Sequence, residues 1–102
     1  MYYTYMIRCE DNSIYTGITI DVDRRVEEHK SKNEKCAKYT KRHTFKKLES
    51  VWESEDRKQA SKLEFHLKHL TKNQKEQLIS NFKSLEDYLS DKLDSDNYKK
   101  II

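Results

Sequence analysis

The spacing of apolar and polar positions changes several times along the chain. Residues 2–9 and 14–20 are both rich in Tyr, Ile and Thr, and they lie on either side of the polar run 10–12. β-Branched and aromatic segments around a short polar run predict two antiparallel strands. The first fifth of the chain is therefore expected to form a β-hairpin.

The register of this hairpin follows from the length of its loop. A three-residue loop pairs Cys9 with Ser13, and the same register places Tyr5 opposite Gly17, with Tyr15 as a diagonal neighbour on one face. Gly17 is the only glycine in the chain, and there is no proline. Glycine inside a strand often marks a close approach, so we expect an open notch beside two phenol groups that admits a ligand or another backbone.

A helical pattern follows the hairpin. Asp21 or Asp23 can cap a helix that runs to about Lys32, with Val22 and Val26 facing inward. Residues 45–53 have the composition of a third strand, after a basic and irregular stretch.

Helical spacing dominates the remainder of the chain. Asp56 with Gln59 and Thr71 with Gln74 resemble capping boxes, each followed by an apolar stripe. The stripes are Ala60, Leu63, Leu67 and Leu70 in the first, Leu78, Ile79 and Phe82 in the second, and Leu85, Tyr88 and Leu89 in a last helix over 84–93. The expected fold is α+β, a small three-stranded antiparallel sheet flanked by helices. We expect one domain over 1–83, followed at 84–102 by an extra helix and a tail that frays from Asp94.

Composition narrows the class of protein. The chain has 102 residues, of which 34% are hydrophobic and 38% charged, so its core must be thin and rely on aromatic side chains. Neither a signal peptide nor a stretch as long as a membrane span is present, and Cys9 and Cys36 match no metal or disulfide spacing. We expect a soluble, cytoplasmic protein with reduced thiols and no membrane partner.

The net charge of +3 is unevenly distributed. Residues 24–47 contain ten Lys or Arg against three acids, a local charge of +7, and Tyr39 and Phe45 lie within this segment. A basic segment with interleaved aromatics suits a nucleic-acid backbone. The alternative is a solvated lysine-rich surface.

Glu64 is the carboxylate whose position carries most information. On a helical wheel it lies about 40° from Ala60 and about 60° from Leu67, close to the buried face. A carboxylate there needs a cation or hydrogen-bond donors to offset desolvation, and a divalent metal is one such partner. The alternative is a half-exposed Glu64 that pairs with Lys68 at i+4. His66 points elsewhere around the same helix, so His66 and His69 do not predict a zinc site.

Several further side chains complete a set that suits phosphodiester cleavage. Arg25 and His29 are four residues apart and share one edge of their helix, so both can face the hairpin. Together with the tyrosines beside Gly17 and the partly buried Glu64, they supply a phosphate ligand, a proton acceptor and a metal ligand. Each tyrosine taken alone is equally compatible with ordinary strand packing.

These motifs, taken in order, carry a family resemblance. They are Thr4-Tyr5, Tyr15 to Thr19 (YTGIT), Arg24-Arg25, Glu28-His29, Ala37-Lys38-Tyr39-Thr40 and Glu64. The set resembles the GIY-YIG nuclease superfamily, particularly its small stand-alone bacterial members, over roughly residues 2 to 80. The chain departs from the family name in its first motif, Tyr3-Thr4-Tyr5, which lacks a glycine, and in the segment 41–45, which lacks Gly and Pro.

The resemblance implies DNA-strand cleavage that depends on Mg²⁺ or Mn²⁺ held by Glu64. The catalytic residues it implies are Tyr5, Tyr15, Arg25, His29 and Glu64. The residues expected to contact substrate are Gly17, Arg24, Lys38, Tyr39, Lys41 and Arg42. Either Tyr5 or Tyr15 could act as the base, and the sequence does not choose between them.

The prediction is thus a metal-dependent endonuclease of DNA repair or recombination, structure-directed or weakly specific because no second domain selects a target. One alternative is a non-catalytic nucleic-acid-binding module that uses residues 24–47. Another is an α/β interaction domain whose charges are solvated surface. DNA is the expected partner, and a protein partner is left open.

Overall fold

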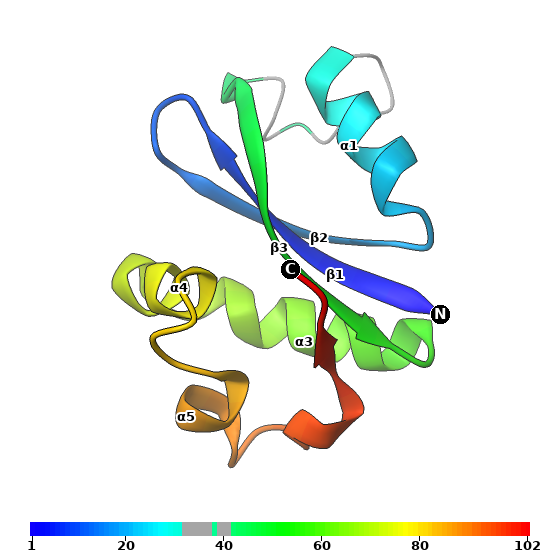
Figure 1. Ribbon diagram of the computed structural model, residues 1–102, viewed down its shortest axis with the longest axis vertical. Helices are drawn as coiled ribbons and strands as arrows, with labels where there is room; N and C mark the ends of the chain where they lie inside the picture. Colours follow the sequence, from blue (N-terminus) through cyan, green and yellow to red (C-terminus); the bar gives the residue numbers. More distant parts are fainter. Residues whose placement is uncertain (32–37, 39–41) are drawn as a thin grey trace.

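The computed structural model describes residues 1–31, 38 and 42–102. The elements in chain order are β1 (Tyr2–Cys9), β2 (Ile14–Thr19), α1 (Val22–Ser31), β3 (Phe45–Ser54), α3 (Arg57–Lys68), α4 (Lys72–Ile79), α5 (Leu85–Leu89), η1 (Ser95–Asn97) and β4 (Lys99–Lys100). The strands form one antiparallel sheet in the order β2-β1-β3-β4 (Figure 1). The α+β fold is therefore confirmed, with a fourth strand that the sequence analysis did not predict.

The hairpin has the predicted register. The Cys9 amide donates to the Ser13 carbonyl at 2.9 Å, and Tyr5 lies opposite Gly17. Asn12 makes the turn with φ of 71°, in the left-handed region that a glycine would otherwise occupy. Gly17 itself has no positive φ, so the backbone does not require a glycine there.

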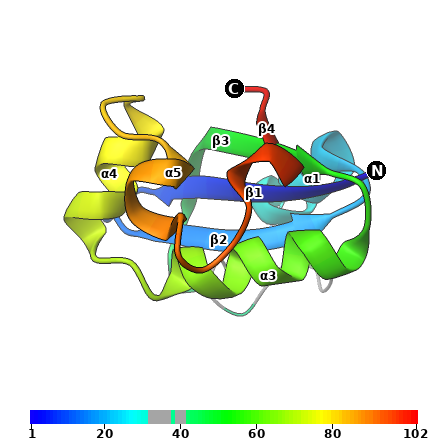
Figure 2. The same cartoon turned by 90° about the horizontal axis from the view of Figure 1, so that it is seen from below.

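Helices cover both faces of the sheet. In Figures 1 and 2, α1 lies on one face, and α3, α4 and α5 lie on the other. Successive residues of a strand point to opposite faces, and β1 is buried on both. One core, beneath α1, is centred on Tyr5, Ile7 and Val51. The other is built from Met6, Trp52, Leu63, Leu67, Leu78, Leu85, Leu89, Leu93 and Tyr98.

Side-chain caps set where the helices begin. Asp21, rather than Asp23, caps α1, because its carboxylate accepts from the Arg24 amide at 3.1 Å. Asp56 accepts from the Gln59 amide at 2.9 Å at the start of α3. The start of α4 has the complete reciprocal capping box that the sequence predicts for residues 71 and 74.

The end of the chain does not fray, and this prediction was wrong. β4 pairs with β3, and the Ile101 amide donates to the Val51 carbonyl at 2.9 Å. The Tyr98 side chain is buried in the larger core, where its hydroxyl donates to the Gln59 carbonyl at 2.7 Å. Leu93 and Tyr98 share that core with α3, so residues 84–102 pack as part of the domain. Of the predicted helix over 84–93, only Leu85–Leu89 is an α-helix.

No helix among the described residues is long and apolar enough to cross a membrane.

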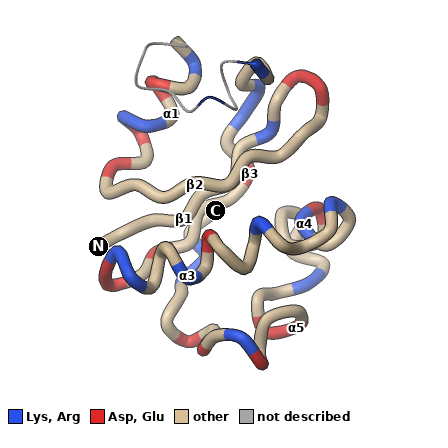
Figure 3. Tube along the Cα trace, turned by 180° about the vertical axis from the view of Figure 1, so that it is seen from behind, with Lys and Arg blue, Asp and Glu red and all other residues tan. Residues whose placement is uncertain are grey.

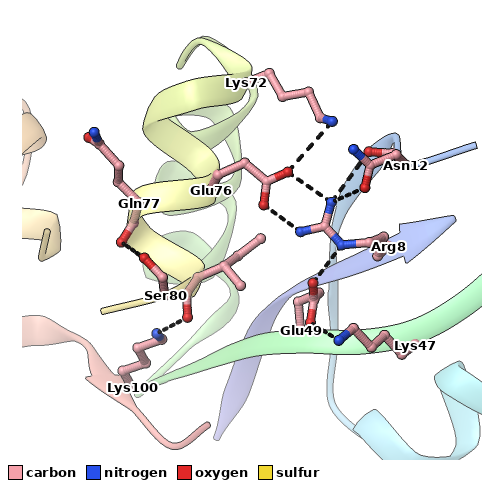
Figure 4. A network of polar contacts seen from close by, with 10 residues as sticks. Arg8, Asn12, Lys47, Glu49, Lys72, Glu76, Gln77, Ser80 and Lys100 are labelled. Atoms are coloured by element: carbon pink, nitrogen blue, oxygen red, sulfur yellow. Dashed lines mark hydrogen bonds and ion pairs between the residues drawn. The ribbon is translucent and has the colours of Figure 1, made fainter. Parts of the chain in front are cut away.

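A charged network joins the hairpin to the helical layer (Figure 4). The Arg8 guanidinium donates to Glu49 on β3 at 2.6 Å and to both carboxylate oxygens of Glu76 on α4. It also donates to the Asn12 side chain at 2.7 Å. The Arg8 and Glu49 side chains are 10% and 11% exposed, so this ion pair is largely desolvated and each of its charges depends on the other, whereas Glu76 is 34% exposed.

Replacing Arg8 by Met should test the network, since Met keeps much of the stem volume but leaves Glu49 without its main partner. Breaking a buried pair by removing one partner costs about 3 to 5 kcal/mol, so we expect a loss of about 3 kcal/mol in unfolding free energy, measured by urea denaturation. Lys72→Met is the matched control, because Lys72 is 52% exposed and its pair with Glu76 contributes about 1 kcal/mol or less. Equal losses in the two variants would contradict the assignment.

Candidate active site

The site is built around the phenol of Tyr5. β1 carries Tyr5 beneath α1, where the residue is 1% exposed. Its hydroxyl lies 2.9 Å from Nε2 of His29 and accepts a hydrogen bond from Nε of Arg25 at 3.3 Å. Arg25 and His29 are four residues apart on α1, so the predicted helical edge does face the hairpin.

The protons of this cluster can be assigned from its hydrogen bonds. Arg25 is always a donor, so the hydroxyl hydrogen of Tyr5 is assigned to the bond toward Nε2 of His29. Burial, and then the charge of Arg25, lower the pKa of His29 to about 4. His29 is therefore neutral at physiological pH and can accept this hydrogen bond.

Tyr5 and Arg25 are displaced from their ordinary pKa in the same direction. Burial, and then the neighbouring Tyr15, raise the pKa of Tyr5 well above its usual value, although Arg25 opposes this. Burial alone would lower the pKa of Arg25, but hydrogen bonds to Glu28 and Tyr5 raise it. At neutral pH the cluster thus contains a protonated phenol, a neutral imidazole and a guanidinium cation.

Gly17 is required because Tyr5 fills the space beside it. A Cβ atom at residue 17 would lie 2.5 Å from the Tyr5 hydroxyl oxygen and 2.7 Å from Cζ of the same ring. It would also lie 3.0 Å from Cε2 of Tyr15. The prediction of an open notch for a ligand was wrong in this respect, because the notch beside Gly17 is occupied by the phenol of Tyr5.

Tyr15 lies at the outer side of the cluster. Its ring centroid is 5.5 Å from that of His29 and 6.3 Å from that of Tyr5. Tyr15 is only partly buried, and the Nζ of Lys68, from α3, lies 5.8 Å from its ring centroid. Because β2 is the edge strand of the sheet, α3 can reach this ring from the opposite face around that edge.

Glu64 belongs to the same edge. Its side chain is 23% exposed and pairs with Lys68 at 3.4 Å, the i+4 partner that the sequence analysis offered as the alternative to a metal. Its negative charge contributes, as the smallest effect, to raising the pKa of Tyr5. Glu64 is therefore close to the tyrosine cluster without being part of its hydrogen bonds.

The other predicted contacts are not brought into this cluster. Arg24, Lys38 and Arg42 are exposed, and Arg24 lines a shallow surface depression with Tyr3 and Ile20. Tyr39 and Lys41 lie outside the described residues.

Two residues at the site were not predicted to act there. Glu28 holds Arg25 through an ion pair of 2.8 Å, and the i+3 spacing of these residues on a helix is a signal that could have found it. Lys68 was expected only as the partner of Glu64. Its contact with Tyr15 depends on how α3 crosses the sheet edge, so the sequence carries no signal for it.

The side chains at this edge fit a metal that retains most of its water. Among the described residues, no group of three or more His, Cys, Asp or Glu side chains is arranged to hold a metal. Glu64 is a single, partly exposed carboxylate, and Mg²⁺ is commonly bound through one or two carboxylates, keeping several waters. This donor chemistry suits Mg²⁺ or Mn²⁺ better than Zn²⁺, which takes three or four protein ligands.

Another cavity lies away from this cluster and does not suggest a second chemistry. It has a volume of about 320 Å³ and is lined by residues that include Trp52, Tyr98 and Lys100. Nζ of Lys100 already donates to the Leu78 carbonyl at 2.8 Å and to the Asn81 side chain at 2.6 Å. Lys100, the cation in this cavity, therefore caps the C-terminal end of α4.

Comparison with known proteins shows which family the chain belongs to. Residues 1–77 match the GIY-YIG catalytic domain. A UPF0213 protein of Fusobacterium nucleatum is 49% identical over 79 residues, 78% of this chain and 77% of its own. Another, of Clostridium perfringens, is 38% identical over 103 residues, 100% of this chain and 98% of its own. The solution NMR structure of a UPF0213 protein from Bacillus halodurans has 43% identity, covers 78% of this chain and 84% of that chain, and has a TM-score of 0.49.

The contact between Tyr5 and Gly17 can be tested by a double-mutant cycle. Gly17→Ala forces the buried Tyr5 ring to move, so we expect a loss of about 1 to 3 kcal/mol in unfolding free energy, as for other overpacked cores. In a Tyr5→Leu background the same alanine should cost less, because the clashing atoms are absent. Additive costs in urea denaturation would show that the two residues do not compete for this space.

The depressed pKa of His29 predicts a pH dependence of stability. Between about pH 6.5 and pH 4 the unfolded chain binds a proton at His29 that the folded protein does not, so stability falls as the pH falls. The shift corresponds to about 3 kcal/mol, present in full above pH 6.5. His29→Gln should lose this component, so its unfolding free energy should change less than that of the wild type between pH 7 and pH 4.5. Parallel pH profiles would contradict a buried neutral His29.

Proposed function

This chain belongs to the GIY-YIG nuclease family, and we propose that it is a divalent-metal-dependent endonuclease that hydrolyses DNA phosphodiester bonds. The observation that carries the proposal is the convergence, around the paired strands β1 and β2, of the Tyr5–His29–Arg25 cluster with Tyr15 and the partly exposed Glu64. Phosphodiester hydrolysis needs a proton acceptor for the attacking water and positive charge for the phosphoryl oxygens. We assign one residue of this group to each task.

Burial, and the lack of a ready acceptor for its proton, argue against Tyr5 as the base. Tyr5 is 1% exposed, so an attacking water cannot reach it without a local opening. Its proton cannot readily move to His29 either, because the pKa of that imidazole is about 4 and an ordinary phenol has a pKa of about 10, a difference of about 8 kcal/mol. Tyr5 is therefore a positioning residue, with Gly17 and His29 behind it.

Tyr15 has the position that a base needs. It is partly exposed, and the Nζ of Lys68 lies 5.8 Å from its ring. We propose that Tyr15, reacting as the phenolate, takes a proton from the attacking water as the new phosphorus–oxygen bond forms and the bond to the leaving sugar oxygen breaks, while the leaving oxygen takes a proton from solvent.

Arg25 and Glu64 act on the phosphate. Arg25 remains charged and is held by Glu28, so its guanidinium is presented to the phosphate in a fixed orientation. Glu64 would hold Mg²⁺ or Mn²⁺, which when bound supplies Lewis-acid stabilisation of a phosphoryl oxygen. Lys68 forms an ion pair with the same carboxylate, so this pair would weaken when a metal binds Glu64.

The substrate preference follows from what surrounds the site. We propose that the activity is structure-directed or weakly specific and that it serves DNA repair or recombination. Arg24, Lys38 and Arg42 are exposed cations that could hold the DNA backbone at a distance from the reacting phosphate.

The decisive experiment incubates the purified protein with plasmid, single-stranded and branched DNA in the presence of Mg²⁺ or Mn²⁺, and then with chelator. We expect cleavage only with metal. Glu64→Gln and Tyr15→Phe should each slow cleavage by about 100-fold or more while DNA binding persists, since each removes a catalytic group rather than a fold contact.

Glu86→Gln and Tyr88→Phe are matched controls, because Glu86 is exposed and both residues lie on α5, away from the proposed site. Full activity of Glu64→Gln would remove the metal assignment. DNA binding with a steep salt dependence, but no cleavage with either metal, would favour the alternative of a non-catalytic binding module.

A further inference from the structure

The outer face of α3 carries an unusual combination of side chains. Phe65 is 58% exposed, and its ring centroid lies 4.4 Å from that of His69 and 5.2 Å from that of His66. The Nδ1 atom of His69 lies 2.7 Å from the Phe65 carbonyl, which holds the imidazole beside the phenyl ring. These rings form a small aromatic platform at the surface.

Basic residues surround the platform. At about 100° per residue, the side chains within about 60° of Phe65 on the helix are Lys58, Ser61, Lys62, Lys68 and His69. None is acidic, and Glu64 is the only carboxylate within Arg57–Lys68. Figure 3 shows Lys and Arg positions distributed along α3.

Helix stability does not account for this arrangement. Arg57 and Lys58 lie in the first turn of α3, where positive charge is unfavourable to the helix dipole. An exposed phenyl ring is likewise not explained by packing, since the apolar face of α3 is already complete through Ala60, Leu63 and Leu67. A single exposed phenylalanine would need no explanation, but a cationic helix face around it suits an anionic ligand with flat apolar groups.

The platform is continuous with the proposed catalytic edge. Phe65 follows Glu64 directly, and Lys68 lies between them on the helix surface, where it contacts both Glu64 and the ring of Tyr15. A nucleic-acid strand with a phosphate next to Glu64 could therefore continue over Lys68 onto Phe65.

We propose that this face of α3, comprising Lys58, Lys62, Phe65, Lys68 and His69, binds an unpaired stretch of the nucleic-acid substrate next to the scissile phosphate, with a base stacked on Phe65. Aromatic stacking is available only to bases that are not paired in a duplex, while lysines neutralise the backbone. The proposal rests on the proposed nuclease function for its position in the reaction, and it narrows the substrate to DNA with a single-stranded segment.

The test measures binding without cleavage, in the full-length Glu64→Gln protein with chelator present. A fluorescein-labelled oligothymidylate is titrated by fluorescence anisotropy at several salt concentrations. Phe65→Ala should weaken binding by about tenfold, the order expected for one lost stacking contact, without changing the salt dependence. Lys62→Ala should instead reduce the salt slope by about 0.7, the value for one phosphate contact to a single strand.

Two controls separate stacking from general loss of binding. Phe82→Ala removes a phenyl ring that is 72% exposed and lies 5.6 Å from Nζ of Lys83, but is not on α3, and it should leave affinity unchanged. An oligonucleotide of abasic sites should bind Phe65→Ala and its parent equally. Circular dichroism and thermal denaturation should show that the surface variants remain folded.

The outcomes distinguish this inference from the proposed function. Wild-type affinity of Phe65→Ala for oligothymidylate, or equal losses in Phe65→Ala and Phe82→Ala, would overturn the stacking site even if the wild-type protein cleaves DNA. Loss of affinity confined to Phe65→Ala, in a protein whose wild type cuts no DNA with metal, would support the site and overturn the nuclease assignment.

Discussion

The packing of the Tyr5 phenol against the bare α-carbon of Gly17 is the constraint on which the site depends. The antiparallel register of β1 and β2 brings the two residues opposite each other, and no side chain larger than hydrogen fits between them. With the ring held there, its hydroxyl meets both His29 and Arg25. One close contact between two strands therefore orients groups that come from a strand and a helix.

The sheet can hold this contact because β1 is buried on both faces. Tyr5 and Ile7 belong to the smaller core beneath α1, whereas Met6 belongs to the larger core beneath α3 and its neighbours. Arg8 then ties the same strand to β3 and to α4. Site geometry is most exact when rigid elements carry it, and here the central strand is anchored from three directions.

Helix α3 has a different role on each of its sides. Its apolar stripe closes the larger core, its edge brings Glu64 and Lys68 to Tyr15, and its outer face exposes Phe65 among lysines. The core contacts fix the rotation of the helix about its axis. Because of this, the placement of the carboxylate and of the aromatic platform follows from apolar residues that have no part in chemistry.

The sequence by itself determined the hairpin register, the helix caps, the α+β class and the family motifs, because loop length, residue period and capping residues act over a few positions. It could not show that Tyr5 fills the space at Gly17, that Tyr15 is the more accessible phenol, or that Lys68 reaches its ring. It also missed β4, whose few residues are held by backbone hydrogen bonds to β3 and by Tyr98 in a distant core. These features were decided only by tertiary structure, since burial and long-range contacts depend on how both helical layers close over the sheet.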